Sequence, residues 1–279
     1  MREPLSILVP TYNEEANIRD CMESVKWADE IFVVDSFSND RTLEICRHYT
    51  DRIVQHEYKN SAAQKNWAIP QTAHRWVMVV DSDERVSEQL RHSIERVLEG
   101  RADCDGYHVK RESFFLGKHM RHGGWDRDWV LRLFNKERGR YQDKEVHACV
   151  KVDGKEGFLT GPLYHYTYRN LDQYFEKFMR YTRWAGADLR ASGRHPAWTN
   201  IAIRPWMRFL KMYVLRRGFL DGKHGLVLSY LAAFSVFTKY ARLWEMHLHQ
   251  EPAPQPEDST CAPHSSEVEL HPDSSRGKS

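Results

Sequence analysis

The chain has few cysteines, and none of them is arranged as a metal or redox cluster. Its five cysteines, spread over 279 residues, form no C-x-x-C pair, and their number is odd. This pattern disfavours a disulfide framework and a zinc cluster, and a reducing compartment fits it best. We therefore expect a cytoplasmic protein.

Long hydrophobic runs are also missing. The run Leu5–Val9 is too short for the apolar part of a signal peptide. The run Leu226–Phe237 falls short of the roughly 20 residues that a membrane-spanning helix needs. The net charge is only +2, so overall charge does not indicate nucleic-acid binding, and we expect no nucleic-acid partner.

The first half of the chain contains short apolar runs that alternate with helical patterns. Leu5–Val9, Ile31–Val34 and Trp76–Val80 are predicted to be buried strands, with a weaker strand near residues 52–54. Helices are expected from Asn13, after a cap at Asp40, and from a cap at Ser87 to an end at Gly100. This alternation predicts an α/β fold with a mostly parallel sheet and helices on both faces.

After Gly106 the pattern changes to mixed strands and glycine-containing loops. The chain from Leu171 to Gln250 has a helical, aromatic-rich pattern, whereas residues 251–279 contain almost no large apolar residues and are expected to be disordered. We therefore predict a catalytic domain over 1–168, a helical region over 169–250 and a tail over 251–279.

The sequence Asp81-Ser82-Asp83 follows the clearest predicted strand. Two other D-x-D patterns occur, at 103–105 and 126–128, but neither directly follows a strong buried strand. In open α/β sheets, ligands bind at the carboxyl ends of the strands, and two carboxylates there can hold a hard divalent cation. A solvated turn that caps the next helix is the alternative.

Polar residues also follow the other two strands. Pro10-Thr11-Tyr12-Asn13 comes after the first and Asp35 to Asp40 after the second. Both segments are expected at the same sheet edge as Asp81. Helix capping by Asn13 and Asp40, and plain solvation of Asp35, remain open as simpler explanations.

The sequence resembles the family 2 glycosyltransferases, and within them the lipopolysaccharide-core glucosyltransferases of the WaaE/KdtX type. The resemblance covers roughly Leu5 to Glu245. The stretches that carry it are Val9–Glu15, Val33–Ser36, Asp40–Thr42, Gln64–Ala68, Asp81–Arg85, Phe114–Lys118, Gly124-Trp125, Arg132–Phe134, Val146-His147 and Gly218–Gly222. It implies a GT-A-like, Rossmann-type sheet with a C-terminal helical extension, and an inverting transfer from a nucleotide-sugar such as UDP-glucose to a hydroxyl of a lipid-linked glycan.

The resemblance also implies roles for individual residues. It places a nucleoside pocket at Asp35 and the first loop, and it places a divalent cation, Mg²⁺ or Mn²⁺, at Asp83 and Asp81. Asp81 is further expected to touch the ribose or a metal-bound water, and Lys65 to offset diphosphate charge, with an exposed helical lysine as the alternative. The full set of expected donor-binding residues is Pro10, Thr11, Tyr12, Asn13, Glu14, Asp35, Gln64, Lys65, Asn66, Asp81 and Ser82.

The catalytic base is the point where this sequence departs from the family. Relatives commonly carry glutamate directly after the histidine that His147 matches, whereas this chain has Ala148. Asp128 is the next candidate, and His147 is the alternative. A salt bridge from Asp128 to Arg127 or Arg132, and a structural role for His147, are the non-catalytic readings.

The segment from Arg204 to Lys223 interleaves basic and aromatic residues. Two interpretations stay open for it: peripheral contact with the anionic inner face of a membrane, or ordinary packing on the catalytic domain.

Two other functions are alternatives. A nucleotidyltransferase normally has a glycine-rich loop after its first strand, and Pro10–Asn13 is not one. A sugar-nucleotide-binding pseudoenzyme is suggested by Ala148, but the intact Asp81-Ser82-Asp83 argues against it.

Overall fold

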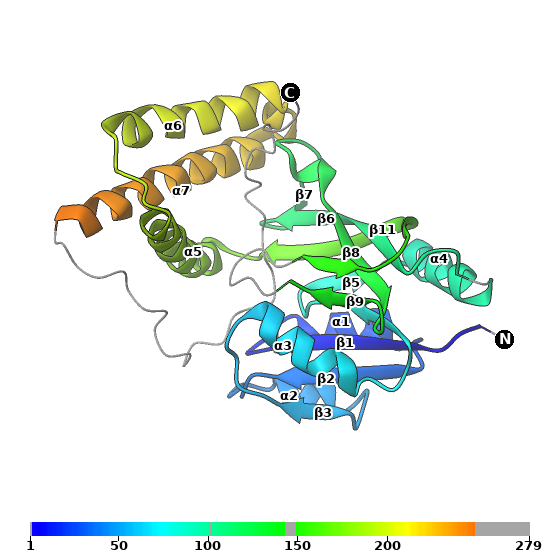
Figure 1. The fold of residues 1–279 in the computed structure, drawn as a ribbon. Helices are drawn as coiled ribbons and strands as arrows, with labels where there is room; N and C mark the ends of the chain where they lie inside the picture. The colour runs from blue at the N-terminus through cyan, green and yellow to red at the C-terminus, as the bar shows by residue number, and fades with distance from the viewer. Residues whose placement is uncertain (1, 101, 143–148, 249–279) are drawn as a thin grey trace. The chain divides into compact units, whose positions relative to one another are not determined.

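The computed structural model describes residues 2–100, 102–142 and 149–248 (Figure 1). The strands are β1 (Leu5–Thr11), β2 (Glu30–Asp35), β3 (Ile53–Gln55), β4 (Trp76–Val79), β5 (Glu84–Val86), β6 (Gly106–Phe115), β7 (Lys118–His119), β8 (Trp129–Asn135), β9 (Gly139–Tyr141), β10 (Val150–Val152) and β11 (Glu156–Tyr168). The helices are α1 (Ile18–Val25), α2 (Thr42–Cys46), α3 (Ser61–Ala68), α4 (Glu88–Glu99), α5 (Leu171–Ala191), α6 (Trp198–Leu210) and α7 (Gly222–Leu248), with short helical turns at Ile69–Gln71, Trp125–Arg127, Lys211–Leu215 and Gly218–Asp221.

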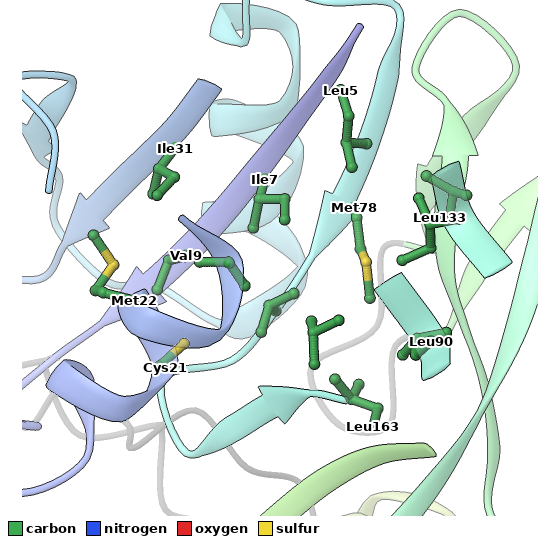
Figure 2. Packing of buried hydrophobic residues seen from close by; sticks show 14 of the residues in the cluster. Leu5, Ile7, Val9, Cys21, Met22, Ile31, Met78, Leu90, Leu133 and Leu163 are labelled. Atoms are coloured by element: carbon green, nitrogen blue, oxygen red, sulfur yellow. The ribbon is translucent and has the colours of Figure 1, made fainter. Parts of the chain in front are cut away.

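The first four strands form the parallel half of a nine-stranded sheet, in the order β3-β2-β1-β4. Alternate residues of β1 enter different clusters: Leu5 and Ile7 pack with α1 and α4, whereas Leu8 packs with α3 on the opposite face. Figure 2 shows Cys21 and Met22 of α1 beside this first cluster. Both faces of the parallel half are therefore covered, which explains why its strands are continuously apolar.

The strand ends lie within two residues of the predicted ones. Val9 pairs with Val33, Thr11 pairs with Asp35, and the backbone N–H of Val80 donates to Leu8, so β1, β2 and β4 are parallel neighbours. The expectation that the three predicted strands lie side by side with their carboxyl ends at one edge is confirmed, whereas β1 ends at Thr11 rather than Val9, β2 at Asp35 rather than Val34 and β4 at Val79 rather than Val80.

The other half of the sheet is mixed, in the order β4-β8-β6-β11-β5. β8 is antiparallel to β4 and β6, and β5 is antiparallel to β11. β6 and β11 run in the same direction, because the N–H of Gly106 donates to Lys155 where they start and the N–H of Leu116 donates to Tyr168 where they end. The α/β class is confirmed, and the uninterrupted parallel part of the sheet consists of the first four strands. Three-residue β5 begins directly after Asp83 and pairs with β11, with His165 opposite Glu84. This pairing brings a distant strand to the Asp81-Ser82-Asp83 turn.

The helix boundaries lie at the predicted capping residues, except that the first helix begins later than predicted. Ser87 caps α4 by accepting from the N–H of Leu90, and α4 ends at Gly100, as predicted. Asp40 accepts from the N–H of Thr42 at the start of α2. The first helix begins at Ile18 rather than Asn13, because Asn13 adopts a left-handed conformation with φ 49°.

The chain divides into two compact units. Unit 1 holds the described residues up to Glu112 together with Asp128–His165, and unit 2 holds Ser113–Arg127 and the described residues from Tyr166 onward. Unit 2 contains α5, α6 and α7, so the predicted C-terminal helical extension is confirmed, whereas residue 168 as a domain boundary stays a prediction. Within the described ranges no helix combines the length and apolarity needed to cross a membrane. The predicted tail over 251–279 lies outside the described residues.

Candidate active site

The candidate site lies in unit 1, at the carboxyl ends of β1, β2 and β4. Asp35 is the last residue of β2, and Asp81 follows the end of β4 by two residues. Both carboxylates are buried, as is Asp83. Buried carboxylates need hydrogen-bond donors or cations as partners, so the groups around each carboxylate indicate its role.

Asp35 is held by hydrogen bonds from two neighbouring segments. Its carboxylate accepts from the backbone N–H of Ser38 at 2.9 Å, from Gln55 Nε2 at 3.0 Å and from the Ser38 hydroxyl. Asn13, in the loop after β1, connects to the loop after β2, because its N–H donates to Ser38 Oγ and its Oδ1 accepts from the N–H of Asn39. The loops after β1 and β2 thus form one hydrogen-bonded rim.

The other residues of the Pro10–Glu14 stretch lie at the end of β1 or directly after it. Glu14 is buried, and its carboxylate accepts a hydrogen bond from Asn17 Nδ2 at 2.6 Å, so it stabilises the start of α1. Thr11 is also buried, and its hydroxyl has no hydrogen-bond partner within the described residues. Tyr12 is half-buried, and the carbonyl of Pro10 accepts from Ser82 Oγ at 3.4 Å.

Helix α3 brings the Gln64-Lys65-Asn66 stretch to this edge. Gln64 Nε2 donates to Ser36 Oγ at 2.6 Å, which ties α3 to the end of β2. Asn66 makes two hydrogen bonds with the backbone of Tyr141. Lys65 is buried, so the alternative of an exposed helical lysine is wrong.

Asp81 is enclosed by two cations. Its Oδ1 lies 3.1 Å from Lys65 Nζ, and its Oδ2 accepts from Arg132 Nη2 at 2.7 Å. Burial alone would raise the pKa of Asp81, but the guanidinium of Arg132 and the ammonium of Lys65 outweigh it and hold that pKa well below its usual range. Both oxygens of Asp81 are therefore engaged within the protein.

Asp83 has a different environment. Its Oδ2 lies 3.6 Å from Nε2 of His165, and both side chains are buried. A carboxylate oxygen and an imidazole nitrogen on converging strands are suitable ligands for a divalent cation. Within the described ranges, which leave out His147, no group of three or more such side chains is present.

Glu84 lies at the centre of a second buried network. Its Oε1 accepts from Arg132 Nη2 at 2.6 Å and lies 3.6 Å from Arg111 Nη1, while its Oε2 accepts from the N–H of Asp81. Arg132 thereby bridges Asp81 and Glu84. Burial lowers the pKa of Arg132, but the nearby Asp81 and Glu84 carboxylates raise it by more, so its charge is permanent.

Asp128 belongs to the same network through Arg111. Arg111 Nε donates to Asp128 Oδ2 at 2.6 Å, so the arginine partner is neither Arg127 nor Arg132, the two expected from the sequence. Arg127 instead lies 3.7 Å from Asp126 at the surface. Asp128 is buried, and its Oδ1 has no hydrogen-bond partner within the described residues. His147 and Ala148 lie outside them.

Sequence reasoning missed three members of the site: His165, Arg111 and Glu84 in its bridging role. A signal for His165 exists, because it alternates with Leu163 and Thr167 on the buried face of β11. Arg111 likewise takes a buried position in the alternating pattern of β6. A charged residue at a buried strand position needs a partner. Here Asp83 is the partner of His165, and Asp128 and Glu84 are the partners of Arg111.

Comparison with known proteins identifies the family. The model of glycosyl transferase family 2 matches residues 6–152, which is more than half of the chain. The lipopolysaccharide core biosynthesis glycosyltransferase LpsC of Rhizobium meliloti is 27% identical over 252 residues, covering 85% of this chain and 93% of LpsC.

Two solved structures are also similar. Staphylococcus aureus TarS 1–349 in complex with UDP-GlcNAc is 14% identical, with a TM-score of 0.44, and the match covers 89% of this chain and 92% of TarS 1–349. Mycobacterium tuberculosis glucosyl-3-phosphoglycerate synthase in complex with Mn²⁺ and UDP-glucose is 21% identical, with a TM-score of 0.32 over 40% of this chain and 43% of that one. On the match over residues 6–152, the chain belongs to glycosyl transferase family 2 and is a glycosyltransferase.

Proposed function

We propose that this glycosyltransferase performs an inverting, metal-dependent transfer of glucose from UDP-glucose to a hydroxyl of a lipopolysaccharide-core acceptor. The observation that carries the proposal is the set of buried carboxylates, Asp35, Asp81 and Asp83, at one edge of the parallel sheet in a family 2 glycosyltransferase. Ligands of open α/β sheets bind at that edge.

The rim of loops after β1 and β2 is the proposed nucleoside site. Asp35 is held in place by Ser38 and Gln55, and a preorganised carboxylate suits the N–H and hydroxyl donors of a nucleoside. The buried Thr11 hydroxyl lies at the paired position on β1, where it can bond to a ligand. Asn13 fixes the loop between them.

The diphosphate is proposed to lie beside Lys65, with Asp83 and His165 as the residues that hold a divalent cation. Their 3.6 Å oxygen–nitrogen separation fits a site completed by phosphate oxygens and water, since Mg²⁺ is commonly bound by few protein ligands together with substrate phosphates. When bound, such a cation stabilises charge on the departing nucleoside diphosphate. Asp81, which stays paired with Lys65 and Arg132, positions both cationic side chains.

Asp128 is the proposed base. In an inverting transfer, a carboxylate takes the proton from the acceptor hydroxyl as its oxygen attacks the anomeric carbon. Arg111 fixes one oxygen of Asp128 at 2.6 Å, which leaves Oδ1 to accept that proton. The acceptor class rests on the similarity to LpsC, whose name describes a lipopolysaccharide core glycosyltransferase.

Sugar release from a panel of nucleotide-sugars, measured with Mg²⁺, with Mn²⁺ and with a chelator, tests the proposal. We expect UDP-glucose turnover that needs the cation, and loss of that turnover in Asp83→Ala with the fold retained. Asp126→Ala is the matched control, because Asp126 lies in another D-x-D pattern and is exposed. Cation-independent turnover in the wild type, or unchanged turnover in Asp83→Ala, contradicts the metal assignment.

A further inference from the structure

Helix α6 of unit 2 carries an apolar stripe on its outer side. We use the name outer stripe for Ile203, Trp206, Met207 and Leu210, which follow an i, i+3, i+4, i+7 spacing and therefore share one helix face. All four are exposed, Trp206 by 63% and Met207 by 62%, and no residue of α6 is buried. Apolar side chains at such spacing normally face a core.

The outer stripe points away from the neighbouring helix. Figure 1 shows α6 and α7 lying side by side. The contacts to α7 include those of Arg204, whose guanidinium donates to Tyr240 Oη at 2.8 Å, and of Phe209, whose ring centroid lies 4.6 Å from that of Tyr230. At about 100° per residue these two side chains lie on the two flanks of α6, and the arc between them faces away from the outer stripe. The apolar face is thus not the packing face.

Exposed apolar residues continue beyond α6. Leu215, exposed by 77%, follows the helix, and Phe219 and Leu220 in the next turn are about half exposed. Exposed apolar side chains that gather over consecutive elements, rather than singly, mark an interaction surface.

The chain segment that forms this surface carries charge of nearly one sign. Between Leu189 and Trp244 the sequence has ten arginines and lysines and a single acidic residue, Asp221. Asp221 is buried and accepts hydrogen bonds from the backbone N–H and the imidazole of His122. Arg204, Arg217 and Lys223 are among the exposed cations. The exposed surface formed by this segment is therefore apolar and cationic, with no exposed carboxylate.

We propose that α6 and the following turn dock on an anionic lipid surface, with the outer stripe in the acyl boundary and the arginines and lysines at the headgroups. Helices of this kind bind membranes through buried apolar area plus attraction to anionic lipids. Long basic side chains can reach the headgroups while their stems stay apolar. A second copy of the chain is a poorer occupant, because a two-fold contact would bring the same cationic surfaces together.

Co-sedimentation of the full chain with lipid vesicles tests the proposal. We compare vesicles of phosphatidylcholine alone with vesicles that contain phosphatidylglycerol in increasing proportion, at low and at high salt. We expect the protein to pellet with anionic vesicles only, with a large loss at high salt because screening weakens the lysine and arginine contributions. Equal pelleting with neutral and anionic vesicles contradicts the charge requirement and overturns the proposal.

Two variants separate the apolar and cationic contributions. Trp206→Ser with Leu215→Ser should abolish pelleting. Arg217→Asn with Lys223→Gln should weaken it by about fivefold per charge, or roughly thirtyfold together. Asparagine is chosen at position 217 because Arg217 has φ 55°, which asparagine tolerates.

The matched controls lie in unit 1. Phe158→Ser removes an aromatic ring that is 67% exposed, and Arg47→Gln with Arg96→Gln removes two exposed charges. Both controls should pellet like the wild type. If the stripe and charge variants pellet as well as the controls, the proposal is wrong.

Two other readouts complete the test. If the wild type stays in the supernatant but is a dimer that Trp206→Ser dissociates, the occupant is a second copy and the lipid proposal is overturned.

Hydrolysis of UDP-glucose in the absence of vesicles should be the same in every variant. This independence distinguishes a failure of lipid docking from a failure of the proposed transfer.

Discussion

Asp81 and Asp83 are two residues apart, yet their carboxylates have different neighbours. Asp81 is neutralised by Lys65 and Arg132, whereas the neighbour of Asp83 is His165, an imidazole that can ligate a metal. A D-x-D pattern alone does not distinguish these roles. The difference comes from α3 and β8, which supply cations to one carboxylate, and from β11, which supplies a histidine to the other.

Replacement of Asp81 by asparagine should destabilise the protein strongly. Asp81→Asn leaves Lys65 and part of the Arg132 charge without compensation in the interior, which typically costs about 3 kcal/mol of unfolding free energy. Urea denaturation measures this loss. Asp103→Asn, at an exposed D-x-D position, should change the unfolding free energy by less than about 0.5 kcal/mol.

The pH dependence of that loss follows from the depressed pKa of Asp81. A carboxyl whose folded pKa is lowered contributes stability that is present above its unfolded pKa, about 3.9, and is lost as the pH falls further towards the folded value. The stability difference between wild type and Asp81→Asn should therefore be constant above about pH 5 and shrink below about pH 4. A difference that grows on acidification would contradict the assignment of charge.

Loss of the carboxylate at Asp128 should act on rate more than on donor binding. Asp128→Asn keeps the shape but has no useful basicity, so transfer should fall by about a hundred- to ten-thousand-fold. The acid limb of the pH–rate profile should disappear, which a purely structural partner of Arg111 would not cause. Asp126→Asn, two residues away and exposed, should retain wild-type rates. Near-normal transfer in Asp128→Asn together with inactive His147→Ala would make His147 the base.

At the scale of elements, the N-terminal cap of α3 should influence the donor site, because α3 carries residues of that site. Asn60 caps α3 by accepting from the N–H of Ala63 at 2.8 Å, and α3 carries Gln64 and Lys65. Asn60→Ala should cost about 1 kcal/mol and weaken donor binding. Asn170→Ala removes the equivalent cap of α5, where Asn170 accepts from the N–H of Gln173, and should cost a similar amount while donor affinity stays unchanged. Isothermal titration with UDP-glucose compares the two, and equal affinity in both variants would contradict the role given to α3.

The elements also show how far the sequence could predict this structure. Strands β1, β2 and β4 were found because both of their faces are buried, which leaves a continuous apolar run. The strands of the mixed half were not predicted one by one, because β5 has only three residues and its position depends on pairing with the distant strand β11. His165 was missed for the same reason: it approaches Asp83 only through the pairing of β11 with β5.

At the scale of the whole molecule, a small net charge conceals a strong segregation. Residues 189–244 carry ten basic residues and one acidic residue, a net +9 in a chain whose total is +2, so the rest of the chain sums to −7. Net charge is therefore a poor guide to the partners of this protein. The fields of the two parts have opposite sign, and a cationic segment can approach an anionic surface although the chain as a whole is nearly neutral.

Donor binding should also raise the melting temperature of the whole chain, because a ligand that binds only the folded state stabilises it. At a concentration about a hundred times its Kd, UDP-glucose with Mg²⁺ should add about 2.7 kcal/mol, which corresponds to a rise of roughly 5–10 °C for a domain of this size. Differential scanning fluorimetry with a panel of nucleotide-sugars measures the shift and ranks the donors.

Two variants connect that shift to the site. Asp83→Ala should lose the part that depends on Mg²⁺, and a chelator should have the same effect on the wild type. Asp35→Asn should reduce the shift with UDP as well as with UDP-glucose, because Asp35 is assigned to the nucleoside and not to the sugar. If Asp35→Asn binds UDP normally and loses only the part of the temperature shift that depends on the sugar, Asp35 contacts the sugar and not the nucleoside. The donor then binds in the reverse orientation, and the proposed position of the acceptor is also wrong.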